Sequence, residues 1–242
     1  MGAVVGLTGV GGGSLMTPLL VLIFNVHPAT AVGTDLLHAA ITKTGGTHVH
    51  AKAGRVDWRI TLLLAAGSLP AAFATIAALR YFTGGLGGSK VITATLGVAL
   101  LLTAAALVLR TFLRRLSQTH VAPARHPGLT VLIGVALGIL VTVSSVGAGA
   151  LGVTALLFLY PQLRTARLVA SDLAHAVPLT LVAGIGHWLF GSVDWRLLAS
   201  LLVGSLPGIY IGSHFAGRIP EFALRMLLAV MLLLVGAKLI MY

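Results

Sequence analysis

The chain has 242 residues, of which 57% are hydrophobic and only 9% are charged. A soluble domain carries roughly 25% charged residues, so too few are present here to cover a soluble surface. The formal net charge is +11, but the basic residues lie mostly between apolar runs rather than on a polar module. We therefore expect the lipid bilayer as a partner and no nucleic acid.

Eight apolar segments predict an all-helical polytopic membrane protein. They cover residues 1–24, 28–50, 57–82, 89–112, 129–160, 164–190, 195–217 and 220–241. A polar, basic stretch with two prolines separates the fourth segment from the fifth. It divides the single membrane domain into a first transmembrane repeat over 1–112, a linker over 113–128 and a second repeat over 129–242.

The first segment contains the glycine cluster VGGGSL at residues 10–15. Glycine in a helix costs about 1 kcal/mol relative to alanine, so we predict an unwound break at this point. The half-helix that follows would direct its N-terminus toward an anion. The alternative is close helix packing, because small residues let helices approach one another in lipid. The candidate anion-binding residues are Gly11, Gly12, Gly13 and Ser14.

The second segment carries Asp35, His38 and Lys43 inside an apolar run. Ionisable residues in spanning segments are costly and usually functional. Asp35 and His38 are three residues apart and share a helix face, and a histidine held by a carboxylate is suited to carrying protons. Lys43 needs an anionic partner, for which Asp35 and a bound substrate are the candidates. Thr34 is a further candidate for substrate binding.

The VDWR sequence at 56–59, which begins the third segment, is predicted to anchor that segment at the membrane interface. Its aspartate would cap the helix that follows, and its Trp and Arg would lie at the level of the lipid headgroups. The GSLP sequence at 67–70 places a proline in the middle of the same segment, where it is expected to kink the helix.

The fifth segment, 129–160, has 32 residues. At about 1.5 Å per residue it would overshoot a hydrocarbon core of roughly 30 Å, so it must tilt, break or re-enter. Gly147, Gly149 and Gly152 are expected to mark the place. The motif VGAGAL at 146–151 matches the first glycine cluster, which adds Gly147 and Gly149 to the candidate anion site.

The later segments repeat the motifs of the first half at a nearly constant spacing. VDWR recurs at 193–196 and GSLP at 204–207. Asp172 and His175 match Asp35 and His38 as proton-coupling candidates, and Ser171 matches Thr34 as a substrate-binding candidate. Thr180 stands where the first half has a lysine. Such internal repeats are typical of transporters built from two related halves, although the repeats alone leave parallel and inverted arrangements open.

If every segment crosses the membrane once, nine basic residues lie on the side of the two termini and six on the other side. This bias favours cytoplasmic termini.

The glycine motif, the A-V-G-T sequence at 31–34 and the repeated VDWR connection resemble the TauE/SafE family of sulfite and organosulfonate exporters over nearly the whole chain. The resemblance implies a secondary transporter of the inner membrane that moves small anions. Sulfite, organosulfonates and related sulfur compounds are the substrates that it implies. The Asp–His pairs favour coupling to protons, while uniport and a homo-oligomeric assembly both stay open.

Two other interpretations compete with proton coupling. The Asp–His pairs would also serve as structural clasps between helices, or their two Asp and two His would together bind one divalent cation. The basic surroundings disfavour the cation, so no metal and no cofactor is predicted. The sequence contains no nucleophile elbow, two-histidine zinc helix or P-loop, and we expect the protein not to be an enzyme.

Overall fold

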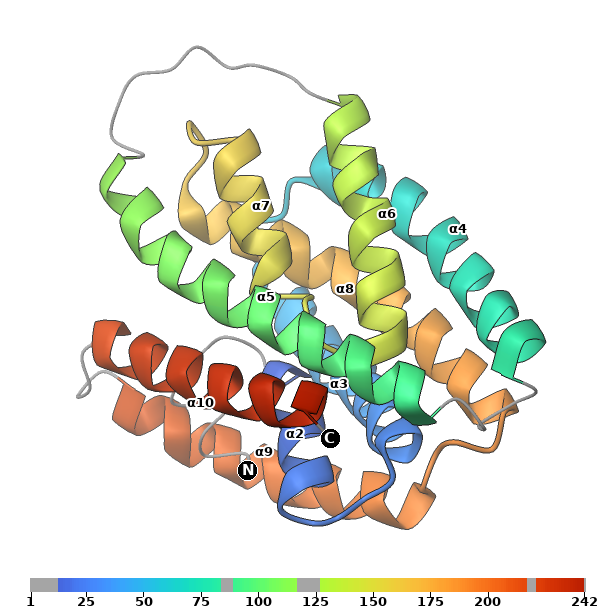
Figure 1. Ribbon diagram of the computed structural model, residues 1–242. Coiled ribbons are helices and arrows are strands. Elements are labelled where there is room, and N and C mark those ends of the chain that lie inside the picture. Colours follow the sequence, from blue (N-terminus) through green and yellow to red (C-terminus); the bar gives the residue numbers. More distant parts are fainter. Residues whose placement is uncertain (1–12, 84–88, 117–126, 217–220, 242) are drawn as a thin grey trace.

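The computed structural model describes residues 13–83, 89–116, 127–216 and 221–241, and within these ranges the chain forms helices and no strands (Figure 1). The helices are α2 (Gly13–Leu22), α3 (Pro28–Lys52), α4 (Trp58–Thr83), α5 (Ser89–Leu116), α6 (Pro127–Ser144), α7 (Leu151–Leu159), α8 (Thr165–Leu189), α9 (Trp195–Ala216) and α10 (Glu221–Met241). By length and composition, three described helices are suited to cross a membrane, within Trp58–Tyr81, Pro127–Ser144 and Thr165–Leu189. The prediction of an all-helical architecture is confirmed.

The long apolar run 129–160 is broken into two helices. α6 ends at Ser144 and α7 begins at Leu151, with an irregular stretch between them. The φ angles of Gly147 and Gly149 are +124° and +112°, a backbone conformation that residues other than glycine rarely adopt. Gly152, the third glycine expected to mark the break, lies instead in the first turn of α7.

α7 turns back toward the start of α6, so the run re-enters rather than crossing once. The hydroxyl groups of Thr130 in α6 and Tyr160 after α7 are 2.6 Å apart, and in Figure 1 both helices extend from the break toward the same end of the molecule. Arg167, at the start of α8, lies 3.2 Å from the Asp57 carboxylate before α4. The α3–α4 and α7–α8 connections therefore share one end of the molecule. The assumption that this segment crosses the membrane once is therefore wrong. The count of basic residues on each side rested on that assumption, so it no longer favours cytoplasmic termini.

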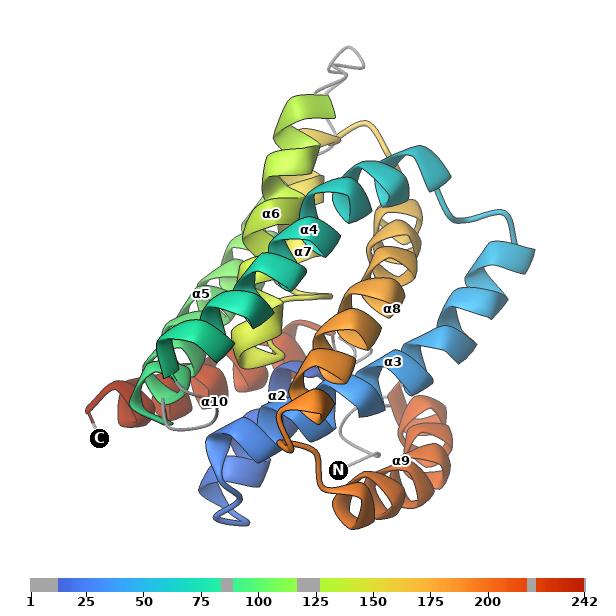
Figure 2. The same cartoon turned by 90° about the vertical axis from the view of Figure 1, so that its right-hand side faces the viewer.

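α3 and α8 form a closely packed antiparallel pair at the centre of the bundle (Figure 2). A Cβ at Gly184 would lie 2.6 Å from the Leu37 side chain, and a Cβ at Gly33 would lie 3.0 Å from that of His187. α4 runs parallel to α6, where Gly138 lies against the Ser68 backbone. Small residues thus set the close helix contacts, as is typical of helices packed in lipid.

The break between α6 and α7 lies inside the molecule. Ala148 packs in a cluster of buried apolar side chains from α3, α4, α6 and α8. Irregular backbone at membrane depth is tolerated where protein surrounds it, because its polar groups then find partners other than lipid. The fold therefore brings the unwound stretch beside the two helices that carry the Asp–His pairs.

Candidate functional site

Ionisable side chains gather in the buried middle of the bundle, around α3, α8 and the break between α6 and α7. The side chains of this cluster are at most 7% exposed, and they are Asp35, His38, Lys43, Asp172 and His175. The sequence predicted all five of them as functional residues. Burying so many ionisable groups inside a membrane protein is costly unless they neutralise one another or serve a ligand.

Asp35 joins the half-helix α2 to the break in the second half of the chain. Thr17 in α2 donates a hydrogen bond of 2.6 Å to Oδ2 of Asp35, and Ser145 donates one of 3.0 Å to the same oxygen. The other oxygen, Oδ1, makes no hydrogen bond and lies 4.0 Å from Nδ1 of His38. Two hydroxyl donors therefore converge on one carboxyl oxygen of Asp35.

Lys43 is the only Lys or Arg whose side chain is buried among the described residues. Its Nζ donates to the carbonyl oxygen of Ala148, inside the break, at 3.5 Å. It interacts electrostatically with Asp172 and, more weakly, with Asp35. Asp35, the protein partner expected from the sequence, is thus one of its two counter-charges, and the matching aspartate of the other half is the stronger one. One cation is shared between both halves of the chain.

Asp172 packs against the first turn of α7. A Cβ at Gly152 would meet Oδ1 of Asp172, so only glycine lets the carboxylate come this close to the helix backbone. The N-terminal end of a helix favours a negative charge. The N–H groups of Leu151 and Gly152, however, donate to the carbonyl oxygen of Gly147. The expectation that the first N–H groups of α7 are free for an anion is wrong at these two residues.

The two histidines make matching hydrogen bonds that cross between the halves. Nε2 of His38 lies 3.0 Å from Oγ of Ser205, and Nε2 of His175 lies 2.7 Å from Oγ of Ser68. Both serines belong to the repeated GSLP motif. Sequence reasoning noted that motif for its proline and missed its serine, although the recurrence of a hydroxyl at one repeat position was an available signal.

The predicted substrate-binding residues Thr34 and Ser171 hold the starts of two helices. The backbone N–H of Asp194 donates to Oγ1 of Thr34 at 3.1 Å, and that of Asp57 donates to Oγ of Ser171 at 2.8 Å. These bonds fix α9 and α4 against the central pair of helices. Contact of either hydroxyl with a substrate stays a prediction.

The first glycine cluster lies largely outside the described residues. This applies to Gly11 and Gly12, while Gly13 and Ser14 open α2 with side chains that are also outside the description. His187, near the end of α8, is 2% exposed and donates to the Thr142 carbonyl oxygen at 2.9 Å.

The four residues of the Asp–His pairs do not form the joint cation site of the metal interpretation. Within the described part of the chain, no three His, Asp or Glu side chains lie close enough together to hold a metal ion. The geometry instead places one ammonium group among two carboxylates.

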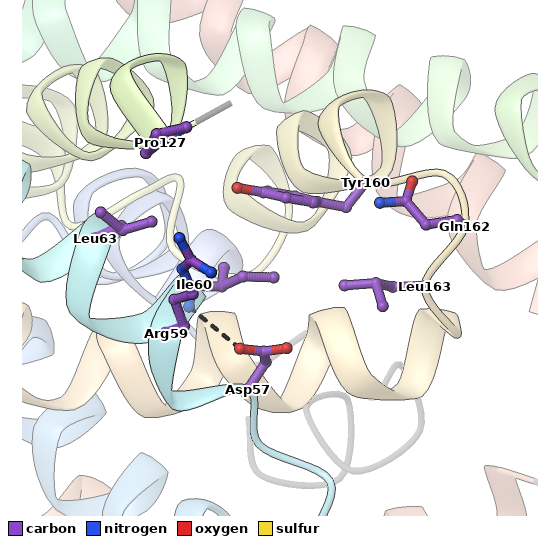
Figure 3. Close-up of a pocket in the computed structure, with 8 residues that line it drawn as sticks. All are labelled: Asp57, Arg59, Ile60, Leu63, Pro127, Tyr160, Gln162 and Leu163. Atoms are coloured by element: carbon purple, nitrogen blue, oxygen red, sulfur yellow. Dashed lines mark hydrogen bonds between the residues drawn. The ribbon is translucent and has the colours of Figure 1, made fainter. Parts of the chain in front are cut away.

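A separate cavity of about 230 Å³ lies at the end of the molecule where the α3–α4 and α7–α8 connections meet (Figure 3). It is lined by Asp57, Arg59, Ile60, Leu63, Pro127, Tyr160, Gln162 and Leu163. Asp57 accepts a hydrogen bond from the N–H of Ile60 at 3.4 Å, which confirms its predicted capping role. None of the five clustered ionisable residues lines this cavity.

The comparisons with known proteins agree with this architecture. The family model described as "Sulfite exporter TauE/SafE" matches residues 1–239. The chain belongs to the TauE/SafE family. A "Probable membrane transporter protein YjnA" from Bacillus subtilis (strain 168) is 39% identical over 99% of this chain and 96% of its own length.

A second relative of this TauE/SafE family member is "Probable membrane transporter protein YdhB" from the same organism. It is 28% identical over 93% of this chain and 90% of its own length. A "Probable membrane transporter protein" from Xylella fastidiosa (strain Temecula1 / ATCC 700964) is 26% identical over 90% of this chain and 82% of its own length. No solved structure matches the chain significantly. The family and the apolar helices together show a multi-pass membrane transporter.

Proposed function

We propose that this protein is a secondary transporter of small anions, with sulfite, organosulfonates or related sulfur compounds as substrates, in the cell inner membrane. The description of its family and the names of its relatives support this class of function rather than an enzyme. Because the sequence contains no ATP-binding motif, an ion gradient or the substrate's own gradient would supply the energy.

The observation that carries the proposal is the buried ammonium group of Lys43. It lies against the irregular backbone of the break and is shared by aspartates of both halves. A cation at this depth marks an ion or substrate pathway in membrane proteins. Discontinuous helices beside the midplane are where transporters hold charged substrates. An anion that reached this point would find the ammonium group of Lys43 beside the irregular backbone of the break.

We further propose that the two halves are inverted repeats, each with a glycine-broken first helix. The matching His–Ser hydrogen bonds support this, since each half supplies the histidine of one bond and the serine of the other. The antiparallel packing of α3 and α8, which carry matching motifs, supports an inverted rather than a parallel relation. A re-entrant segment makes the number of crossings in a repeat odd, and an odd number inverts the next repeat.

We propose that proton linkage belongs to the carboxylates of the cluster rather than to the histidines. His38 and His175 are tied through Nε2 to serines of other helices, which is the geometry of a clasp. The clasp and the proton interpretation therefore apply to different members of each pair. The histidines would hold the helices together and orient the carboxylates, and a carboxylate of the cluster would exchange protons.

Thermal unfolding of the purified protein with a panel of ligands tests the proposal. Sulfite, thiosulfate, sulfoacetate, taurine and sulfate form the panel, with divalent metal ions as the rival ligands. A ligand present at a hundred times its dissociation constant stabilises the folded state by about 2.7 kcal/mol, which raises the melting temperature by several degrees. We expect one or more of the sulfur anions to do so. Stabilisation by a divalent metal alone would contradict the proposal and favour a metal-binding protein.

A further inference from the structure

The carboxylate of Asp172 occupies the position beside Lys43 and the first turn of α7 that a transported anion would need. It packs against the N-terminal turn of α7, where only Gly152 leaves room for it. It is also the main electrostatic partner of Lys43, the one buried cation among the described residues. An anion that binds at this ammonium group must therefore replace the negative charge of Asp172.

The balance of charge in the cluster leads to the same conclusion. With both aspartates ionised, the cluster holds two negative charges and one positive charge. No titratable residue faces it from α6, α7 or α2, because Pro127–Ser144, Leu151–Leu159 and Gly13–Leu22 contain none. The charged residues of α4, α5 and α9, and His214 of α9, stand near the ends of those helices. His187 of α8 lies two helical turns or more beyond His175 and donates to the Thr142 carbonyl oxygen. Among the described side chains, the titratable groups identified beside the two aspartates are therefore Lys43, His38 of α3 and His175 of α8. Adding an anion to a site that is already negative is strongly unfavourable at low effective dielectric constant.

Asp35 differs from Asp172 in how its charge is held. Two hydroxyl groups, from Thr17 and Ser145, donate to its Oδ2. Hydrogen bonds to a carboxylate stabilise its charged form. Asp172 is the stronger of the two electrostatic partners of Lys43, the same group that the substrate anion would take. Of the two carboxylates, Asp172 is thus the one whose charge the substrate displaces.

We infer that Asp172 is a tethered competitor of the substrate: its ionised carboxylate and the transported anion exclude one another, so each anion binds together with one proton on Asp172. This inference rests on the proposed function, which it deepens by naming the device that couples the anion to the proton. A proton joins a carboxylate oxygen of Asp172, the ammonium group of Lys43 is left without its counter-charge, and the anion supplies a new one. Release of the anion reverses these steps.

The test is the pH dependence of anion binding to the purified full-length protein at equilibrium. Sulfoacetate, sulfate and thiosulfate serve as probes, because their charges stay constant between about pH 6 and about pH 8. Uptake of one proton per anion predicts that the dissociation constant falls about tenfold for each unit by which the pH is lowered. Calorimetry in buffers of different ionisation enthalpy should show about one proton taken up per anion bound by the unaltered protein.

The variant Asp172→Asn keeps the shape of the side chain and removes its charge. We expect it to bind the same anions with little pH dependence and as tightly as the unaltered protein does at the lowest pH. Asp35→Asn serves as the matched variant, in which the tenfold dependence per pH unit should persist. Binding by the unaltered protein that ignores pH and takes up no proton overturns the inference and leaves the proposed function standing. Failure of every probe and of sulfite to bind at any pH removes the proposed function itself.

Discussion

Replacing Lys43 by methionine is expected to weaken anion binding about 100-fold or more. The ammonium group is the only buried Lys or Arg charge among the described residues, and methionine fills similar space without a charge. Removing one member of a buried charge pair typically costs about 3–5 kcal/mol. Part of this free energy would appear as weaker binding of the substrate anion. Titration of the purified variant with the sulfur anion that stabilises the unaltered protein measures the loss.

Lys52→Met is the matched control for this substitution. Lys52 lies at the end of the same helix, α3, with an exposed side chain, so its variant should bind the anion as the unaltered protein does. Equal binding by both variants would show that the buried ammonium group has a structural role, and that the anion binds elsewhere.

Replacing Gly147 and Gly149 together by alanine is expected to abolish transport. Both glycines have φ angles that strain any L-residue, at a cost of about 1–3 kcal/mol each. A shift of this stretch would move the Ala148 carbonyl oxygen away from Lys43. It would also break the hydrogen bond of 3.0 Å that Ser145 donates to Asp35. Substrate flux into proteoliposomes, measured at equal amounts of inserted protein, reports the effect.

Gly45→Ala provides the comparison, because a Cβ at Gly45 in α3 would meet nothing within 4 Å and its backbone is helical. That variant should transport normally. Normal transport by the Gly147 and Gly149 variant, at normal expression, would mean that the conformation of the break is not needed for function. Lost expression of that variant alone would instead indicate a packing role for the glycines.

The helices, the buried ionisable residues and the break in the fifth segment were all predictable from the sequence. Each depends on a local pattern: an apolar run, a charge that interrupts it, or a run too long to cross as one helix. The five residues of the buried cluster stand out because charged groups are scarce in this chain.

The partners of these residues were not predictable in the same way. Ser145 and Asp35 are 110 residues apart, and a serine near glycines has no signature that distinguishes it from a packing residue. The pairing of Lys43 with Asp172 depends on α7 turning back and on α3 and α8 lying antiparallel. Hydropathy measures neither, because a re-entrant run and a crossing run have the same apolar composition.

Anion flux in proteoliposomes, with and without an imposed pH gradient, is the direct measurement of proton-linked anion transport by this protein. We expect vesicles that contain the purified protein to take up sulfite or sulfoacetate faster than protein-free vesicles do, and the anion to accumulate on the side toward which protons flow. Asp172→Asn should still move the anion down its own gradient but should no longer respond to the pH gradient. Flux of every tested sulfur anion at the rate of protein-free vesicles would contradict transport of these anions by the protein. Flux that ignores the pH gradient would remove the proton role and leave the Asp–His pairs as structural clasps.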